Sequence, residues 1–335
     1  MPPVLPSESG PHTAELATAV EAVRLAMRVC RRVQSGITPD VLEKNDRSPV
    51  TVADYASQAV VCRAIAVAFP DDRIVAEEDS AALRQPGQAP FLTQVREHLA
   101  ASGLNAADDE VLAWIDAGGG ACGSRFWTLD PIDGTKGFLR REQYAVSLAL
   151  IVDGRIEIGL LGCPQMPPEI GARDAGGGSI FRAVRGRGAE VSAADEAAGW
   201  RPITASPTSD PAAARLCESV ERQHSAHDLS ARIAQDLGIA VPPVRMDSQA
   251  KYAAVARGEA DLYLRLPTRA DYRENIWDHA GGVLLVEEAG GRVTDLDGRP
   301  LDFTRGQKLT ANRGLVVTNG RLHERVLDAV RRVGA

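Results

Sequence analysis

Residues 130–135 read Asp130-Pro131-Ile132-Asp133-Gly134-Thr135 and form the most informative stretch of the chain. Two carboxylates three positions apart flank a proline, and the following glycine allows a sharp change of direction. Both carboxylates and the Ile132 carbonyl can then face one point, and such hard oxygen ligands favour Mg²⁺ or Ca²⁺ over zinc. Thr135 could begin a helix, whose free N–H groups favour a bound phosphate. A plain turn between strands is the alternative, because Asp, Pro and Gly are common turn residues.

The residues around this hexapeptide predict strands preceded by helices. A strand over 126–129 leads into it, and the Asp153-Gly154 turn between apolar runs 144–152 and 155–161 is a strong hairpin signal. Upstream, apolar spacing predicts one helix from Thr13 to about Gln34 and a second over 53–69. A short strand is expected at 74–76, one or two helices in the polar excursion 80–124, and another strand pair in 176–191. The segment up to about residue 205 is therefore predicted to pair two helices with a largely antiparallel sheet.

Beyond residue 205 the chain alternates between predicted strands and helices, which is typical of an α/β domain with a parallel or mixed sheet. Strands are expected at 215–220, 244–246, 262–266, 291–296 and 315–318, and helices at 227–237, 248–258, 276–289 and 321–333. A single core stops growing at roughly 250–300 residues, so a chain of 335 residues should form two domains or two stacked sheets. We predict a tail over 1–12, a helix-plus-antiparallel-sheet domain over 13–205 and an α/β domain over 206–335.

The charge balance excludes some classes of function. Acidic residues outnumber basic residues by 45 to 38, which gives a net charge of −7. A nucleic-acid coat protein normally has a basic surface, and the aromatic content of 4 % leaves an RNA-cleaving enzyme few stacking surfaces. No nucleic-acid partner is expected. A phosphorylated small molecule stays compatible with this charge, because a metal ion can supply positive charge locally.

The chain offers no targeting or membrane signal. Residues 1–10 lack the basic and apolar segments of a signal peptide. The longest uncharged apolar run, 145–152, is far shorter than the ~18–20 residues of a membrane helix. Five widely spread cysteines without a CxxC pair predict free thiols in a reducing compartment. We therefore expect a cytoplasmic protein without a membrane partner.

Three further acidic segments have ordinary explanations when each is considered alone. Glu77-Glu78 could be a solvated turn at a strand end, Asp54 could cap a helix, and Asp278 could face the dipole of a helix that opens at Ile276. Considered together with the hexapeptide, they predict one oxygen-rich cavity. Metals about 3.5–4 Å apart in such a cavity can bind both the attacking water and the leaving oxygen of a phosphate ester. Without a cation these carboxylates would repel one another.

The order and spacing of these motifs resemble a known superfamily. Glu77-Glu78, the 130–135 hexapeptide and Ile276-Trp277-Asp278-His279-Ala280-Gly281-Gly282 are similar to the lithium-sensitive, Mg²⁺-dependent phosphatases that include inositol monophosphatase and fructose-1,6-bisphosphatase. Within it, the stretches 45–55, 126–154, 224–228 and 247–267 most resemble the 3′(2′),5′-bisphosphate nucleotidases, which convert 3′-phosphoadenosine 5′-phosphate (PAP) to AMP. The resemblance covers the chain from about Thr13 onward. It implies an α+β fold arranged as a layered αβαβα sandwich.

The resemblance also implies a role for individual residues. Two or three Mg²⁺ ions would be bound by Glu77, Asp130, Asp133, Asp278 and the Ile132 carbonyl. Asp54 and Thr135 would activate the attacking water, since a hydroxyl can relay a proton to a carboxylate. The substrate would contact Gly134, Thr135, His224, Ser248, Lys251, Arg265 and Asp278. Ser248 and Lys251 stand three apart on one face of the helix expected at 248–258, so both could reach one ligand.

Several alternatives stay open. An inositol phosphate or fructose 1,6-bisphosphate could be the substrate in place of PAP, and the phosphosulfate form of PAP could be used as well. A nucleotide- or metal-binding sensor without turnover is an alternative of another class. His224 and His227 have zinc-like spacing, but no cysteine or third histidine lies nearby in the sequence, which disfavours zinc. The oligomeric state could be a monomer or a homodimer.

Overall fold

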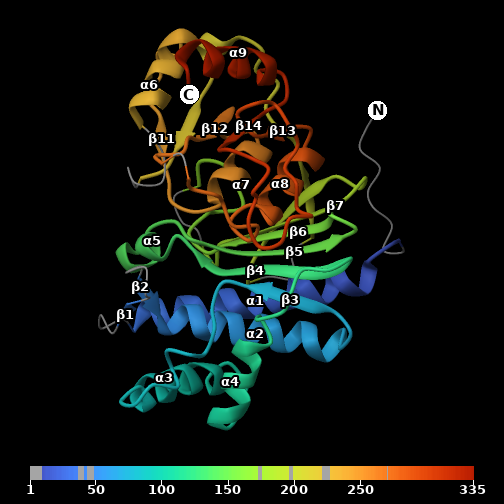
Figure 1. The fold of residues 1–335 in the computed structure, drawn as a ribbon, viewed down its shortest axis with the longest axis vertical. Coiled ribbons are helices and arrows are strands. Elements are labelled where there is room, and N and C mark those ends of the chain that lie inside the picture. Colours follow the sequence, from blue (N-terminus) through green and yellow to red (C-terminus); the bar gives the residue numbers. More distant parts are fainter. Residues whose placement is uncertain are drawn as a thin grey trace.

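The protein is layered as helices, sheet, helices, sheet and helices (Figure 1). The computed structural model describes the chain apart from residues 1–9, 37–40, 44–48, 173–175, 196–198, 221–226 and 270. Helices α1 and α2 cover one face of a seven-stranded sheet, and α7 and α8 cover the other. A five-stranded sheet follows, with α6 and α9 beyond it. The expected αβαβα sandwich is confirmed.

The seven-stranded sheet is antiparallel except at one edge. Its strands lie side by side in the order β3-β4-β5-β6-β7-β8-β9, and β3 runs parallel to β4 while the other neighbours are antiparallel. This confirms the largely antiparallel sheet, although β9 and the small β1–β2 hairpin were not predicted. The bounds are β1 Val41–Glu43, β2 Pro49–Thr51, β3 Arg73–Ala76, β4 Arg125–Asp133, β5 Ala145–Val152, β6 Arg155–Cys163, β7 Ser179–Val184, β8 Ala189–Ala193 and β9 Arg201–Ile203.

The helices of the first half agree with the apolar periodicity. Helix α1 (Thr13–Ser35) buries Val23, Met27 and Cys30 on the side that faces the sheet, at the spacing of a helix. Helix α2 (Val52–Ala68) lies beside it and ends before Pro70. The 80–124 excursion contains α3 (Ala89–Ala100) and α4 (Asp108–Asp116), which pack on α2 and extend the first core outward.

The five-stranded sheet is mixed, as the alternating pattern predicts. Its order is β11-β10-β12-β14-β13, with β10 parallel to β11 and β12, and β14 antiparallel to β12 and β13. The bounds of the elements are β10 Leu216–Glu218, α6 His227–Asp236, β11 Val244–Arg245, α7 Ala250–Ala256, β12 Leu262–Arg265, α8 Ala280–Glu288, β13 Arg292–Thr294, β14 Leu315–Thr318 and α9 His323–Val333, with a 3₁₀ turn η1 at Pro211–Ala213.

Glycines allow α8 to lie close to its neighbours between the sheets. A Cβ on Gly281 would lie 2.8 Å from the carbonyl oxygen of Leu160 in β6, and one on Gly282 would lie 2.4 Å from the ring of Tyr252 in α7. Only residues without a side chain fit at this separation. The close packing fixes α8, and with it the turn that precedes α8, against the seven-stranded sheet.

Three helices begin later than predicted: α7, α8 and α9, the last of which starts at His323 rather than at Arg321. Helix α8 starts at Ala280 rather than Ile276. Asn275 bridges to Lys308, the N–H of Ile276 donates to the carbonyl of Gln307, and residues 277–279 form a turn before the helix. Helix α7 starts at Ala250 rather than Ser248, because Ser248 has a φ of 65°, which lies outside the helical region. The division at residue 205 into two domains stays a prediction. Among the described residues, the helices are too short or too polar to cross a membrane.

Candidate active site

The hexapeptide 130–135 is the end of a strand followed by a helix, so the plain turn is wrong. Strand β4 shifts register between Asp130 and Asp133, where Pro131 interrupts the pairing with β5. Gly134 follows with a φ of 87°, and α5 (Thr135–Arg140) begins directly after it. A Cβ on Gly134 would lie 3.0 Å from Cβ of Ser248. The glycine therefore lets the end of β4 lie against the segment that precedes α7.

Three of the predicted metal ligands, Asp130, Asp133 and Asp278, have a raised pKa. Burial raises the pKa of Asp130 well above its usual range, and the charges of Glu77, Asp133 and Asp278 raise it further. Burial likewise raises the pKa of Asp278; Arg265 opposes this shift, while Asp133 and Glu77 add to it. Asp130 is 1 % exposed. These mutual effects place the four carboxylates in one electrostatic cluster.

Glu77 and its neighbour Glu78 lie in different surroundings. Glu77 is exposed, and its N–H donates to the carbonyl of Leu129, which joins the ends of β3 and β4. Glu78 is buried, and its backbone exchanges hydrogen bonds with the amide of Gln58. Glu77 is therefore the residue of the pair that can offer its carboxylate to a ligand at the strand ends.

The donor set fits a hard divalent cation. Buried carboxylates that raise one another's pKa destabilise the folded chain when all are ionised, because each charge is both desolvated and repelled. A cation shared between them removes this cost. The candidate ligands are all oxygens, which is the preference of Mg²⁺.

The two residues expected to activate water lie beside this cluster. The hydroxyl of Thr135 donates to the carbonyl of Ile132 (3.4 Å), and the N–H of Ile132 donates to Oδ1 of Asp130 (3.1 Å). Asp54 is 2 % exposed in the first turn of α2, and its charge is among those that raise the pKa of Asp130. Asp54 and Thr135 thus lie near Asp130 and approach it from different elements.

The segment before α7 is attached directly to the acidic cluster. The N–H of Gln249 donates to Oδ2 of Asp133 at 2.5 Å. The buried ammonium of Lys251 donates to the carbonyls of Ser248 (2.6 Å) and Met246 (3.1 Å). Burial lowers the pKa of Lys251, while the charge of Asp133 opposes this shift. Lys251 and Ser248 therefore lie together, although the expected shared helical face is wrong because Ser248 precedes the helix.

Arg265 is held by a buried network that sequence reasoning missed. At the end of β12 its Nε lies 2.9 Å from Oε2 of Glu274. The same oxygen lies 3.2 Å from Nε2 of His279, whose Nδ1 lies 2.8 Å from the hydroxyl of Tyr252. Burial would raise the pKa of Glu274, but Arg265 and His279 outweigh it and lower this pKa to about 2. His279 is part of the Trp277-Asp278-His279 motif, yet nothing in the sequence links Glu274 to Arg265.

Glu274, Asp278 and His279 form the one group of potential metal ligands that, within the described ranges, brings its ligand atoms within 4.8 Å of one another. Burial lowers the pKa of His279, so its imidazole is neutral. An ionised Glu274 then accepts from Nε2, and Nδ1 accepts from Tyr252. Both ring nitrogens are occupied, and Glu274 is paired with Arg265. We interpret this group as a support for the turn that holds Asp278, rather than as a metal centre of its own.

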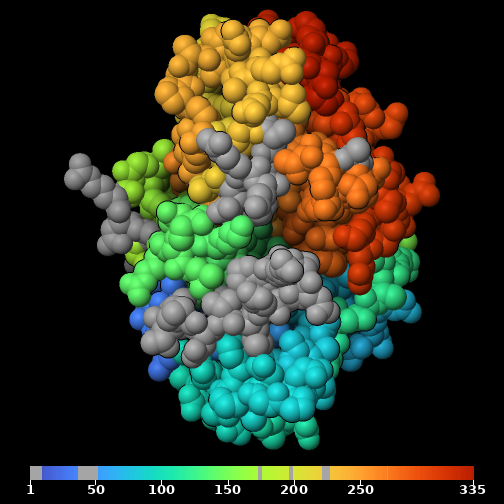
Figure 2. All heavy atoms as spheres, turned by 60° about the vertical axis from the view of Figure 1, so that its left-hand side comes forward, coloured from blue at the N-terminus to red at the C-terminus, as the bar shows by residue number. Residues whose placement is uncertain are grey.

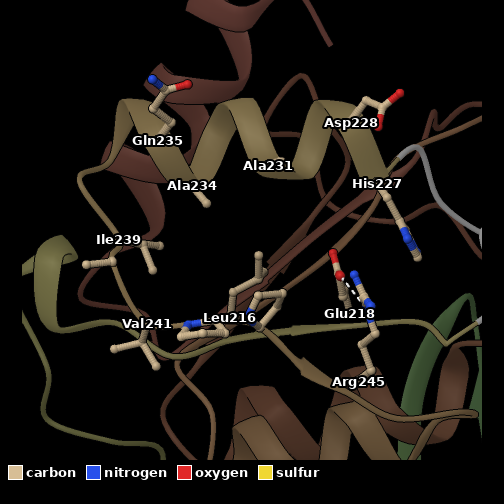
Figure 3. Close-up of a pocket in the computed structure, with 13 residues that line it drawn as sticks. Leu216, Glu218, His227, Asp228, Ala231, Ala234, Gln235, Ile239, Val241 and Arg245 are labelled. Carbon is tan, nitrogen blue, oxygen red and sulfur yellow. Dashed lines mark hydrogen bonds and ion pairs between the residues drawn. The ribbon is translucent and has the colours of Figure 1, made fainter.

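His224 lies outside the described residues, but His227 lines a hollow of about 650 Å³ between α6 and β10–β11 (Figure 3). Its imidazole points to the end where Glu218 pairs with Arg245 at 2.9 Å. Within the described part of the chain, neither ring nitrogen of His227 has a hydrogen-bond partner. The N–H of Met246 donates to the carbonyl of Glu218, so this end of the hollow adjoins the segment that leads to Lys251.

The site elements lie on one face of the protein. Figure 2 shows the green segment that contains α5 and the orange segment that follows β12 on the same side of the molecule. The ends of β3 and β4, the segment before α7 and the turn before α8 thus contribute to one region. Such a region, at strand ends between packed layers, is a common position for a ligand site.

Comparison with known proteins decides the family. Residues 12–335 match the inositol monophosphatase family. The chain belongs to this family. The family consists of metal-dependent phosphatases that generally use Mg²⁺, which agrees with the oxygen donor set described above.

Relatives at the sequence level are similar over nearly their whole length to this member of the inositol monophosphatase family. A 3′(2′),5′-bisphosphate nucleotidase of Oryza sativa is 43 % identical over 96 % of this chain and 94 % of its own length. The corresponding protein of Emericella nidulans is 41 % identical over 93 % and 96 %. One from Schizosaccharomyces pombe is 40 % identical over 94 % of each chain.

Solved structures of the family share the fold. A Thermotoga maritima IMPase superimposes with a TM-score of 0.66 at 20 % identity, covering 96 % of this chain and 98 % of its own. An inositol monophosphatase from Anabaena gives a TM-score of 0.62 at 25 % identity, covering 95 % of both chains. The resemblance inferred from the ordered acidic motifs is therefore confirmed.

Glu274→Gln should raise KM more than it lowers kcat in this member of the inositol monophosphatase family. The amide keeps the hydrogen-bonding shape but removes the charge that pairs with Arg265, so the guanidinium would lose the position that its predicted contact with the substrate requires. We expect KM for a phosphorylated substrate to rise about tenfold, which corresponds to about 1.4 kcal/mol, while kcat stays within about threefold. Steady-state kinetics with Mg²⁺ would measure both. A positioning role would be contradicted if Glu274→Gln and Glu274→Ala each lowered kcat by the same factor by which they raised KM.

Proposed function

We propose that this chain is a Mg²⁺-dependent phosphomonoesterase that hydrolyses the 3′-phosphate of PAP and releases AMP. The observation that supports this most is its identity of about 40 % with curated 3′(2′),5′-bisphosphate nucleotidases over nearly the full length. The buried carboxylate cluster at the end of β4 supplies the chemistry of a phosphatase, and the buried Lys251 beside it supplies positive charge for an anionic substrate.

The acidic residues have the role of metal ligands in this proposal. Glu77, Asp130, Asp133, Asp278 and the Ile132 carbonyl would bind two or three Mg²⁺ ions. When bound, Mg²⁺ neutralises phosphate charge and lowers the pKa of a coordinated water. Thr135 would orient the attacking water through its hydroxyl, and Asp54 would accept the proton.

The remaining residues would bind the nucleotide. Lys251 and Arg265 would pair with phosphate oxygens, since both cations already face the acidic cluster. Gly134, Thr135 and Ser248 would contact the substrate where β4 and the segment before α7 meet, and Asp278 would lie near the ester oxygen. His224 would bind the nucleoside part. A small-molecule substrate without a nucleic-acid or membrane partner, a cytoplasmic location and a monomeric or homodimeric state stay predictions.

Phosphate release from competing substrates tests the proposal. The purified chain with Mg²⁺ should hydrolyse PAP at least ten times more efficiently than 5′-AMP, inositol 1-phosphate or fructose 1,6-bisphosphate. A tenfold difference in kcat/KM corresponds to about 1.4 kcal/mol of transition-state preference. A higher efficiency with inositol 1-phosphate or fructose 1,6-bisphosphate would overturn the nucleotide specificity and leave the metal chemistry intact. Binding of PAP without phosphate release would favour a sensor instead.

A further inference from the structure

Four arginines line a second hollow. It lies between the C-terminal end of α1 and the C-terminal end of α5, opposite the end of α5 that follows Gly134. The hollow has a volume of about 630 Å³. Figure 1 shows this end of α1 next to α5. Its lining residues are Arg28, Arg31, Arg32, Gln34, Ser35, Arg141, Gln165 and Asp195. The lining thus contains four guanidinium groups and one carboxylate, although the net charge of the whole chain is −7.

Among the residues that the structure describes, three of these arginines have no acidic partner. Asp195 pairs with Arg31 at 2.9 Å. Within the part of the chain that the structure describes, the guanidinium groups of Arg28, Arg32 and Arg141 form no ion pair and no hydrogen bond. Arg28 and Arg32 are four residues apart on α1, so they lie on one face, where like charges destabilise a helix. The hollow therefore concentrates charge that the fold itself does not use.

Arg141 occupies a backbone position that favours glycine. It forms the C-cap of α5 with a φ of 59°, and its N–H donates to carbonyls of the last turn of that helix. A residue with a Cβ is strained in this left-handed region, where glycine is the usual choice. The chain has an arginine there instead, and the side chain lines the hollow. Strain at such a position points to a function for the side chain.

Hydrogen-bonded amides make the wall of the hollow rigid. Gln34 is 6 % exposed, and its Nε2 donates to the carbonyl of Phe138 in α5 at 2.8 Å. Nε2 of Gln165, which follows β6, donates to Oε1 of Gln34 at 3.0 Å. These bonds join α1, α5 and the end of β6. The arginines are thus presented from a fixed framework rather than from loose loops.

We propose that this hollow is an anion-binding site for a small molecule that bears two or more phosphoryl groups. Guanidinium groups bind phosphate oxygens in pairs, and three of them in one hollow match an anion with several charges. A bound anion would also relieve the repulsion between Arg28 and Arg32. The site is separate from the acidic cluster, because Thr135 begins α5 and Arg141 caps its opposite end.

Calorimetric titration with inorganic pyrophosphate tests the site without relying on catalysis. The full chain is titrated at low salt in EDTA, so that no metal can recruit the anion to the acidic cluster. We expect saturable binding that weakens at least tenfold in Arg28→Gln/Arg32→Gln. The control pair Arg325→Gln/Arg331→Gln removes the same charge from exposed positions on α9 and should bind like the unmodified chain. Orthophosphate should bind more weakly than pyrophosphate.

Arg141→Gly separates binding from folding. Glycine relieves the backbone strain, so the melting temperature should rise while the affinity for pyrophosphate falls. Lys251→Met, which alters the candidate active site, should leave this binding unchanged. The proposal is overturned if pyrophosphate does not bind, if the α9 control pair loses as much affinity as the α1 pair, or if Lys251→Met abolishes binding.

Discussion

Asp130→Asn is expected to lower kcat/KM for PAP by about 10³-fold or more, which is about 4 kcal/mol, and to raise the melting temperature of the metal-free protein. The activity falls because the substitution removes a central carboxylate from the donor set, and a bound metal contributes several kcal/mol to the stabilisation of charge in phosphate ester hydrolysis. The stability rises because Asp130 is buried among like charges that raise its pKa.

The pH dependence of this stability has a definite sign. An acid whose pKa is raised on folding binds its proton more tightly in the folded state, so the metal-free protein loses stability as the pH rises above the unfolded value of about 3.9. Asparagine has no such charge. The gain in melting temperature for Asp130→Asn should therefore be larger at pH 8 than at pH 5, in EDTA.

Calorimetry and phosphate release would measure the two effects on the same preparations. Asp328→Asn on α9 is a matched control, because Asp328 is exposed and paired with Arg331. Asp328→Asn should keep full activity, and its melting temperature should show no gain that increases with pH. The assignment of Asp130 to the metal site would be wrong if Asp130→Asn kept activity within tenfold of the unmodified chain, or if it lowered the melting temperature in EDTA.

Lys251→Met should reduce kcat/KM for PAP about 100-fold, which corresponds to about 2.7 kcal/mol. The value of kcat/KM for inositol 1-phosphate should fall by less than about threefold. The methionine keeps an unbranched stem of similar length and removes a buried cation that faces Asp133 and lies 5.2 Å from the ring centre of Tyr263. A substrate with a second phosphate depends on that cation, whereas a monophosphate at the acidic cluster does not.

The two substrates act as controls for each other in the Lys251→Met experiment. A general defect in folding would lower both rates by the same factor, and thermal melting would reveal it. Equal losses for PAP and inositol 1-phosphate in a folded variant would mean that Lys251 supports the metal site as a whole. The assignment of Lys251 to nucleotide binding would then be wrong.

The resemblance carried by the ordered acidic motifs predicted the layers, and local apolar patterns predicted many of the helices and strands. Apolar spacing predicted α1 and α2. Asp133 ends β4 as expected, whereas Asp278 lies in the turn before α8 rather than in the first turn of that helix. The starts of α7 and α8 were wrong because distant contacts determine them. The N–H of Ile276, for example, donates to the carbonyl of Gln307, thirty-one residues later in the chain.

The support around Arg265 was beyond sequence reasoning for the same reason. Glu274 resembles any acidic loop residue in the sequence, and its role depends on burial beside Arg265 and His279. The expected substrate contact of Arg265 did not include this ion pair with Glu274. The sequence around Arg141 does not single it out either, because only its backbone φ of 59° distinguishes it from an ordinary surface arginine.

The hydrogen bond between Gln249 and Asp133 has a consequence for the assembly of the site. The two residues are 116 positions apart, so the bond closes a long loop of chain that includes most of the seven-stranded sheet and the first two strands of the other. Closing so long a loop costs conformational entropy before any contact compensates for it. Local helices and hairpins can therefore form while the carboxylates are still separated from Lys251. A competent site exists only once the two sheets have docked through α7 and α8, which makes catalysis a property of the finished tertiary structure.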